Sequence, residues 1–228
     1  MLFMYWTGPI TDCPSSVTAW RKIYRNFEMF TDDHVIPLLP YGFRDVFLQI
    51  RLPAAKSDLA RLLLLREFGG LYLDAHVGPT ASADLLETLD PLCSHNLILF
   101  GKGWAMQKET DFDLMNGILA GRRGTAELNI IIDIVINNIL AQRKKENITS
   151  AYVPYHLFSL TGTYAIIQAF FDQSGPRPCL KREFQSSIKL HFMVDNQKSG
   201  FELAAYYTYR RPGTHWSERE KTERFFLD

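Results

Sequence analysis

Asp74 and His76 are the pair of residues in this chain best suited to binding a metal ion. They end a short apolar run that follows Gly69-Gly70, a pattern that predicts a buried strand. Residues two apart on a strand point to the same side, so both side chains can face one cation. A carboxylate with an imidazole suits manganese or zinc better than magnesium. We therefore expect a site for manganese or another divalent cation; the alternative is an ordinary turn with a surface histidine.

A second pair, Asp58 and Arg61, lies three residues apart on the helix predicted before that strand. This spacing places both side chains on one face of the helix. The simplest interpretation is a surface ion pair, which is worth about 0–1 kcal/mol. Next to a metal site, Asp58 can instead accept a hydrogen bond from a sugar or ribose hydroxyl. Arg61 would then orient Asp58 or contact the bound sugar itself.

The elements that must position these residues alternate between strand and helix, which predicts a mixed α/β sheet. The expected strands cover 2–6, 34–39, 71–74, 96–101, 114–119, 188–193 and 203–209. The expected helices cover 17–27, 53–68, 125–143 and 161–172. Pro53 suits the first turn of its helix, and Gly69-Gly70 stops that helix. The central strand then carries Asp74 at its exposed end, where ligands bind in open α/β sheets. The last two strands are expected to form a hairpin.

Length and composition describe a single α/β domain spanning 1–228. The 25 basic and 25 acidic residues give zero formal net charge, which indicates no nucleic-acid partner. The three cysteines fit neither a disulfide framework nor a zinc ribbon and favour a reducing compartment. The amino terminus has no signal-peptide pattern, and the longest apolar block, 130–140, is too short and polar to span a bilayer. We therefore expect a cytoplasmic protein without a transmembrane segment.

The stretch from Ser57 to Val77, SDLARLLLLREFGGLYLDAHV, resembles the signature of the DXD-motif glycosyltransferase superfamily. That superfamily includes the clostridial toxin glucosyltransferases, the yeast initiating α-mannosyltransferases and bacterial capsule and lipopolysaccharide sugar transferases. Its pattern is a helix with S-D-x-x-R followed by G-G-x-Y-x-D-x-D. His76 departs from this pattern, which has a second aspartate there, and makes the motif similar to the D-x-H of the polypeptide N-acetylgalactosaminyltransferases.

Weaker matches extend the resemblance along the chain. Trp6-Thr7-Gly8 resembles the family's W-x-G, whose tryptophan stacks on the nucleotide base. Asn116-Gly117 is similar to its N-G-x-x-A segment, and Thr161-Gly162 to its T-G-P, with Thr163 in place of proline. His215-Trp216-Ser217 resembles the carboxy-terminal residues that close over the donor pyrophosphate.

The resemblance implies three groups of site residues. The implied catalytic residues are Asp58, Arg61 and Asn116. The implied nucleotide-sugar contacts are Trp6, Thr7, Asp58, Arg61, Tyr72, Asp74, Ala75 and Trp216. The implied metal ligands are Asp74, His76 and His215.

The resemblance also implies a fold and a function. The expected fold is the type A glycosyltransferase fold, a mixed Rossmann-like central sheet flanked by helices. Residues 1–125 would bind the nucleotide sugar, and 126–228 would supply the acceptor half and a carboxy-terminal lid. The expected activity is metal-dependent hexosyl transfer from a nucleotide sugar, with a UDP-sugar favoured, and with retention of configuration.

The acceptor and two competing functions stay open at this point. A glycan, lipopolysaccharide or lipid-linked glycan in bacterial polysaccharide biosynthesis is the default acceptor, and a protein is the other candidate. Arg210-Arg211 would allow peripheral contact with a membrane surface, whereas the charged run 218–224 predicts a solvated helical end. One competing function is that of a non-catalytic homologue that binds nucleotide sugar or metal. The other is that of a structural α/β domain in which the D-x-H motif is incidental.

Overall fold

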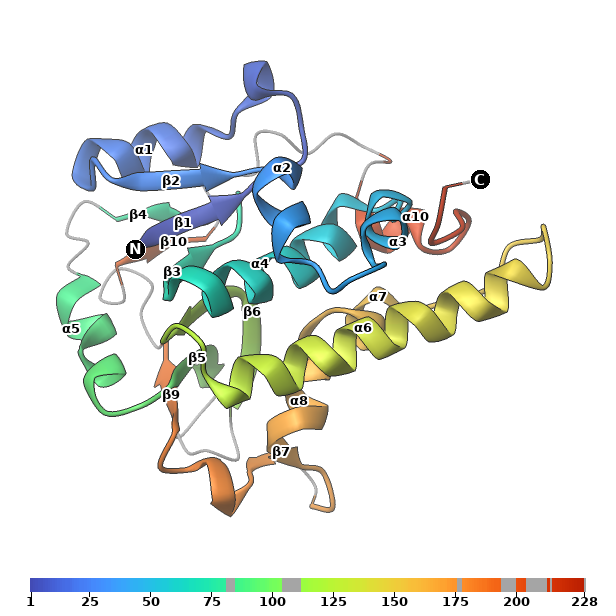
Figure 1. Cartoon of the computed structure of the whole chain (residues 1–228). Coiled ribbons are helices and arrows are strands. Elements are labelled where there is room, and N and C mark those ends of the chain that lie inside the picture. Colours follow the sequence, from blue (N-terminus) through green and yellow to red (C-terminus); the bar gives the residue numbers. More distant parts are fainter. Residues whose placement is uncertain are drawn as a thin grey trace.

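The computed structural model describes residues 1–80, 85–103, 112–175, 178–193, 200–203, 213 and 215–227. A mixed six-stranded sheet forms its centre (Figure 1). In spatial order its strands are β2 (Phe27–Phe30), β1 (Leu2–Tyr5), β3 (Gly70–Leu73), β6 (Phe112–Gly121), β5 (Leu97–Gly103) and β9 (Ile188–Phe192). Strands β2, β1 and β3 run parallel, β6 is antiparallel to both β3 and β5, and β9 is parallel to β5. The predicted fold class, a mixed Rossmann-like sheet flanked by helices, is confirmed.

Two hydrophobic clusters form on opposite faces of this sheet because side chains alternate along each strand. In β1, Phe3 and Tyr5 enter one cluster, whereas Leu2 and Met4 enter the other. The first face is covered by helices α4 (Pro53–Phe68), α6 (Ala126–Asn147) and α8 (Thr163–Phe170). The second is covered by α1 (Ser15–Ile23) and α5 (Leu85–Leu89). Helices α4 and α6 pack side by side across their face (Figure 1).

Helix α4 matches the predicted range 53–68, and both of its ends follow from the sequence. Pro53 occupies the first turn, where its missing N–H costs nothing. Gly69 and Gly70 have φ values of 65° and 111°, which side chains rarely adopt. A side chain at Gly70 would also collide with the main chain of Met1. The double glycine therefore lets the chain turn sharply from α4 into the central strand β3.

The prediction of a second strand at 34–39 is wrong, as is the extension of the first helix to residue 27. Helix α1 ends at Ile23, and the strand beside β1 is β2. Residues 34–38 instead fall in α2 (Asp32–Val35) and a following 3₁₀ turn at Ile36–Leu38. The main-chain N–H of Thr31 donates to Nδ1 of His34 over 3.2 Å, a capping interaction that starts a helix rather than a strand.

The predicted hairpin near the carboxy terminus joins 188–193 to 203–209, and only its first strand is fully described. Strand β9 pairs with β5, and β10 (Phe201–Glu202), just before the second predicted strand, pairs with β4 (Gly78–Pro79). The rest of the strand expected at 203–209 lies outside the described residues, from 204 onward. A second short pair, β7 (Phe171–Asp172) with β8 (Cys179–Leu180), follows α8.

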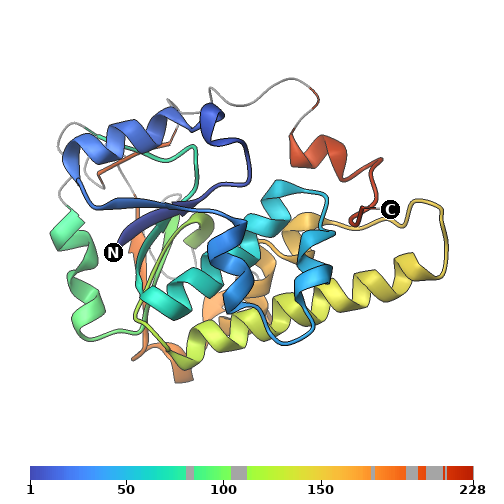
Figure 2. The same cartoon turned by 45° about the horizontal axis from the view of Figure 1, so that its top comes forward.

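The carboxy-terminal segment, residues 215–227, returns to the start of α4 (Figure 2). It contains α10 (Trp216–Arg219), and its last residues contact the chain just after α3 (Arg44–Leu48). Phe226 forms an isolated bridge with Ile50, and Leu227 donates its N–H to the carbonyl of Gln49 over 2.7 Å. None of the helices within the described ranges is both long and apolar enough to cross a membrane.

Candidate functional site

The carboxyl ends of β1 and β3 lie at the same edge of the sheet because these neighbouring strands are parallel. Trp6 follows β1 and Asp74 follows β3, so the topology brings the two predicted site residues together. A pocket of about 330 Å³ opens at this edge, and we call it the larger pocket. Its lining residues are Tyr5, Trp6, Thr7, Gly8, Leu52, Pro53, Ala54, Ser57, Arg61, Asp74, Ala75, His76, His215, Trp216 and Arg219.

Trp6 presents its indole to the larger pocket because the ring rests directly on Gly8. A methyl group at Gly8 would lie 2.6 Å from the six-membered ring of the indole, so only glycine allows this approach. The indole Nε1 also donates a hydrogen bond of 3.2 Å to the carbonyl of Pro9. The tight turn after β1 therefore fixes the orientation of the ring and explains why tryptophan and glycine occur two residues apart.

Arg61 is the centre of the polar network beneath the pocket. Its Nη2 lies 2.9 Å from Oδ1 of Asp58 and 3.1 Å from Oδ1 of Asp74. Its Nη1 donates to the carbonyl of Asn116, and its Nε donates to the carbonyl of Ser57 over 3.1 Å. The side chain is buried, so the network is shielded from water. Arg61 thus holds both predicted carboxylates, which fits its predicted role of orienting Asp58.

The ionisation of Arg61 is secured by its neighbours. Burial alone would lower the pKa of its guanidinium, but Asp74, Tyr72 and Asp58 raise it above the usual value. The guanidinium also lies 4.9 Å above the ring centroid of Tyr72, a cation–π contact. Arg61 therefore remains charged and neutralises part of the negative charge of the two carboxylates.

Asp58 faces a second, smaller pocket of about 100 Å³ that adjoins the larger one. Its Oδ1 accepts a hydrogen bond of 3.1 Å from Nδ2 of Asn116, and its Oδ2 accepts one of 2.8 Å from the hydroxyl of Thr161. Burial raises the pKa of Asp58 to about 6, although Arg61 and these hydrogen bonds act in the opposite direction. The residues lining the smaller pocket are Ala54, Asp58, Arg61, Asp74, Asn116, Leu157, Phe158, Gly162, Thr163 and Trp216.

Asp74 is held from two sides and lines both pockets. Its Oδ1 accepts a hydrogen bond of 2.7 Å from the hydroxyl of Tyr72, and its main-chain N–H donates to the carbonyl of Gly117 over 2.8 Å. A methyl group at Gly117 would lie 2.8 Å from Oδ2 of Asp74, so glycine leaves room for the carboxylate. Tyr72 itself is fully buried and lines neither pocket, so the structure places it beneath the site, as a support for Asp74.

The three predicted metal ligands, Asp74, His76 and His215, all line the larger pocket. Within the described ranges, however, no three side chains of histidine, cysteine, aspartate or glutamate form a group that could hold a metal ion. Nδ1 of His215 lies 2.7 Å from the hydroxyl of Ser217, at the start of α10. Oδ1 of Asp74 already accepts bonds from Tyr72 and Arg61. The chemistry therefore fits a cation bound by Oδ2 of Asp74 and an imidazole, completed by oxygen atoms of a ligand.

The carboxy-terminal segment contributes a residue that sequence reasoning did not single out. Arg219 lines the larger pocket and forms a two-bond ion pair with Glu223, with N–O distances of 2.8 and 2.7 Å. The charged run 218–224 was expected to be a solvated helical end. That expectation fails at Glu220, which is buried. Arg210-Arg211, the predicted membrane contact, lies outside the described residues.

Comparison with known proteins gives a family match for part of the chain. Residues 13–97 match the model of a family described as a glycosyltransferase sugar-binding region containing a DXD motif. The matched region includes α4, β3 and the residues Asp58, Arg61 and Asp74, so the predicted resemblance is confirmed there. A search of curated protein sequences gave no match.

Three solved structures have a similar but distant architecture. The PaToxG glycosyltransferase is 16% identical, with 74% of this chain and 67% of that chain covered and a TM-score of 0.43. The UDP-bound glycosyltransferase domain from the YGT toxin is 12% identical, with 82% and 58% covered and a TM-score of 0.44. A glycosyltransferase involved in the glycosylation of the major capsid of PBCV-1 is 12% identical, with 85% and 83% covered and a TM-score of 0.40.

Proposed function

Because residues 13–97 match a glycosyltransferase sugar-binding region, we propose that this protein transfers a sugar from a nucleotide-sugar donor to an acceptor. One observation carries the proposal. Arg61 holds Asp58 and Asp74 at the point where the larger and smaller pockets meet. A donor with its nucleotide in the larger pocket and its sugar in the smaller one would place the bond that breaks beside this network.

The larger pocket suits the nucleotide part of the donor. Trp6 offers a rigid ring face, and stacking of a base on an aromatic side chain contributes about 1–3 kcal/mol. Thr7 and Ala75 line the same pocket and are proposed to contact the donor. The cavity volume of about 330 Å³ is within the usual range for small-molecule sites. We favour a UDP-sugar as the donor.

A divalent cation, with manganese favoured, is proposed to bind at Asp74 and His76. His215 is proposed as a further ligand from the carboxy-terminal segment. When bound, such a cation neutralises negative charge on the leaving diphosphate. Tyr72 and Arg61 keep the carboxylate of Asp74 in place through its other oxygen atom. A nitrogen ligand at His76 is the reason for preferring manganese to magnesium.

The smaller pocket suits the transferred hexose. Asp58 is proposed to accept a hydrogen bond from a sugar hydroxyl, and Asn116, which donates to Asp58, is proposed to lie beside the reacting sugar. Leu157 and Thr163, from the second half of the chain, line this pocket, which supports an acceptor-binding role for 126–228. Retention of configuration is part of the proposal, by resemblance.

The proposed acceptor is a glycan, lipopolysaccharide or lipid-linked glycan in bacterial polysaccharide biosynthesis, with a protein as the alternative. Peripheral contact with a membrane is included for the lipid-linked case. The three cysteines are free of disulfides, which supports the proposed cytoplasmic location.

A second candidate function is that of a non-catalytic homologue, which binds a nucleotide sugar without transferring the sugar. Two observations favour this candidate. His76 replaces the aspartate of the family pattern, and the described residues contain no group of three metal-binding side chains. Binding and transfer must therefore be measured separately.

The test is a donor panel. The protein is incubated with UDP-, GDP- and dTDP-sugars plus manganese, and nucleotide release is compared with that of the Asp74→Ala and Asp133→Ala variants. Asp133 is exposed on α6 and serves as the matched control. We expect release with one nucleotide class, its loss in Asp74→Ala and its retention in Asp133→Ala. Binding in calorimetry without release would favour the non-catalytic homologue. Equal release by Asp74→Ala would contradict the proposed site.

A further inference from the structure

Arg219 is a charged group of the larger pocket that the proposed function has not used. It is the last residue of α10 and shares the pocket lining with Asp74, His76 and Trp216. Its Nε and Nη2 each donate one hydrogen bond to Glu223. A guanidinium carries five N–H groups, so the ion pair uses only part of its capacity. The two N–H groups of Nη1 stay outside this ion pair and can bind an anion in the pocket.

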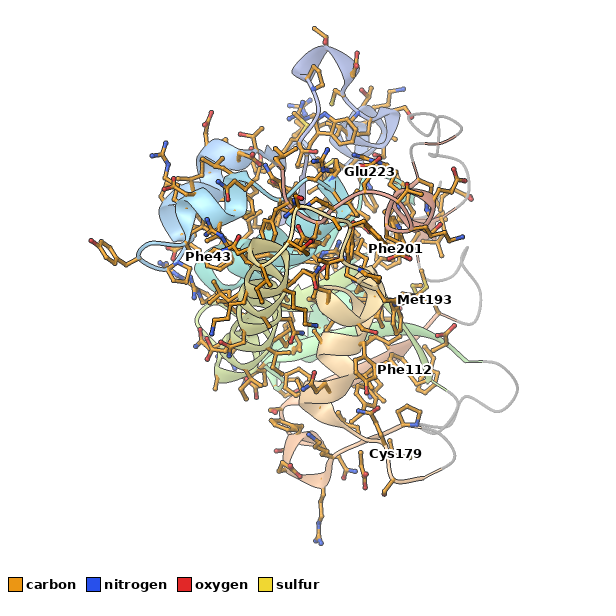
Figure 3. The ribbon with its side chains drawn as sticks, turned by 90° about the vertical axis from the view of Figure 1, so that its right-hand side faces the viewer. Phe43, Phe112, Cys179, Met193, Phe201 and Glu223 are labelled. Carbon is orange, nitrogen blue, oxygen red and sulfur yellow. The ribbon has the colours of Figure 1, made fainter. Side chains whose placement is uncertain are left out.

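The position of α10 is fixed by hydrogen bonds between the residue that follows it and the segment before α8. The buried Glu220, next to Arg219, accepts a 2.7 Å hydrogen bond from the main-chain N–H of Leu157. The carbonyl of Glu220 accepts a 2.6 Å bond from the hydroxyl of Tyr152. Figure 3 labels Glu223, the ion-pair partner of Arg219, on the same carboxy-terminal segment. Arg219 is thus held in place before any ligand binds, which lowers the entropy cost of binding.

A second anchor lies further along the segment. The buried carboxylate of Glu146, near the end of α6, accepts bonds from the main-chain N–H of Phe225 over 2.9 Å and of Phe226 over 3.2 Å. The segment that carries Arg219 is therefore attached at Glu220, within the ion pair, and again beyond Glu223. Arg219 cannot be treated as a surface residue on a loose tail.

The two arginines of the larger pocket have different surroundings. Arg61 is buried between the carboxylates of Asp58 and Asp74, so its charge is already compensated. Arg219 pairs with one carboxylate, and its side chain is 25% exposed. A diphosphate in this pocket needs cationic partners, and a guanidinium binds phosphate oxygens with charge-assisted hydrogen bonds. Of the two, Arg219 is the one with capacity for such a ligand.

We propose that Arg219 binds the diphosphate of the nucleotide donor directly and does so without a metal ion. This inference rests on the proposed function, because it assumes that the larger pocket takes a nucleoside diphosphate. It adds a phosphate contact from the carboxy-terminal segment, on the helix that follows His215.

The test measures binding by calorimetry in EDTA, with UDP and uridine as probes. We expect the native protein to bind UDP more tightly than uridine. In Arg219→Gln the Kd for UDP should rise by about tenfold to one-hundredfold, as for the loss of one or two charge-assisted hydrogen bonds, with uridine binding unchanged. The matched control is Arg123→Gln, which removes an exposed arginine paired with Glu67 and should change neither Kd. GDP with guanosine replaces the uridine pair if the donor panel selects GDP.

Two further variants separate phosphate binding from a structural role. Arg219→Lys keeps the charge and should retain most of the preference for UDP. Glu223→Gln removes the ion pair but leaves Arg219, so its loss of UDP binding should be much smaller than that of Arg219→Gln. Equal losses in Glu223→Gln and Arg219→Gln would mean that the ion pair only holds the fold, and would overturn the inference. Thermal unfolding verifies that each variant is folded.

Different binding results would overturn the inference and the proposed function. UDP binding that Arg219→Gln leaves unchanged overturns the inference alone. Absence of binding to UDP, GDP and dTDP, with or without manganese, overturns the proposed function and the inference with it.

Discussion

The two walls of the larger pocket are built in different ways. One wall comes from α4 and β3, where Arg61 joins Asp58 and Asp74 in a buried network on top of the hydrophobic core. The other wall is α10, whose segment is attached by buried carboxylates that accept main-chain N–H groups. The first wall is part of the folding core. The second is fastened to that core at a few polar points.

Because of this difference, substitutions in the two walls should affect stability and ligand binding to different extents. A change in the Arg61 network should affect folding and the site together, because buried charges lose their partners. A change in the anchors of α10 should weaken ligand binding and cost less stability than a change in the Arg61 network. Variants of Arg61, Glu146 and Asp58 test this contrast.

Replacing Arg61 should give the largest effect. In Arg61→Met, Asp58 and Asp74 lose their shared cation while remaining buried or half-buried. Breaking a buried ion pair on one side costs about 3–5 kcal/mol, so the free energy of unfolding in urea should fall by that amount. Nucleotide release should be lost as well.

Arg66→Met is the matched control for this change. Arg66 lies on the same helix and donates to the carbonyl of Leu38 over 2.9 Å. Its loss should cost about 1 kcal/mol, as for a single hydrogen bond. If Arg61→Met were no more destabilising than Arg66→Met, the α4–β3 wall would not depend on the buried network.

Replacing Glu146 tests the other wall. In Glu146→Gln the amide NH₂ would face the main-chain N–H of either Phe225 or Phe226, at a cost of about 1–3 kcal/mol in the free energy of unfolding. Because the carboxy-terminal segment is then held less firmly, the variant protein should also bind UDP several-fold more weakly.

Glu127→Gln is the control on the same helix. Glu127 is buried as well, but it accepts hydrogen bonds from the side chain of Asn96 instead of holding the carboxy-terminal segment. The Glu127→Gln variant should be less stable than the native protein but should bind UDP with the same affinity. Equal UDP affinities in Glu146→Gln and Glu127→Gln would show that the anchor does not position α10 for binding.

The smallest expected effect is on the pH dependence of stability. Burial raises the pKa of Asp58 from 3.8 to about 6, so the folded protein binds this proton more tightly than the unfolded chain. The free energy of unfolding contributed by Asp58 therefore decreases as pH rises from about 4 to 6. Between about pH 4.5 and 6 the decrease should be on the order of 1 kcal/mol and absent in Asp58→Asn. Parallel profiles for both proteins, from urea unfolding, would contradict the raised pKa.

The sequence correctly predicted elements whose ends are marked by proline or glycine. It failed where contacts with distant parts of the chain determine the secondary structure. Helix α4 was predicted because Pro53 and Gly69-Gly70 mark its ends. Strand β2, with the sequence FEMF, was missed because Phe27 also fits the end of the preceding helix, and only the pairing of the strand with β1 fixes it. The apolar run 34–39 suggested a strand, but capping at Thr31 makes its first part helical.

The candidate site likewise contains residues that the sequence predicted and residues that it did not. Asp58, Arg61 and Asp74 lie within one short stretch of recognisable spacing, and the structure brings them together. Arg219 was not predicted because it belongs to a charged run, and nothing local shows that Glu220 beside it is buried. The contact between Thr161 and Asp58 joins residues 103 positions apart, a separation that no local pattern reveals.

The placement of the tryptophans gives the protein a built-in optical reporter. Trp6 and Trp216 both line the larger pocket, so a stacked nucleotide base would quench their fluorescence. Trp20 is fully buried and donates its Nε1–H to the carbonyl of Val77, which shields its emission from any ligand. Titration with unlabelled nucleotide can therefore follow occupancy of the pocket against the emission of Trp20; Trp104, the fourth tryptophan, lies outside the described residues.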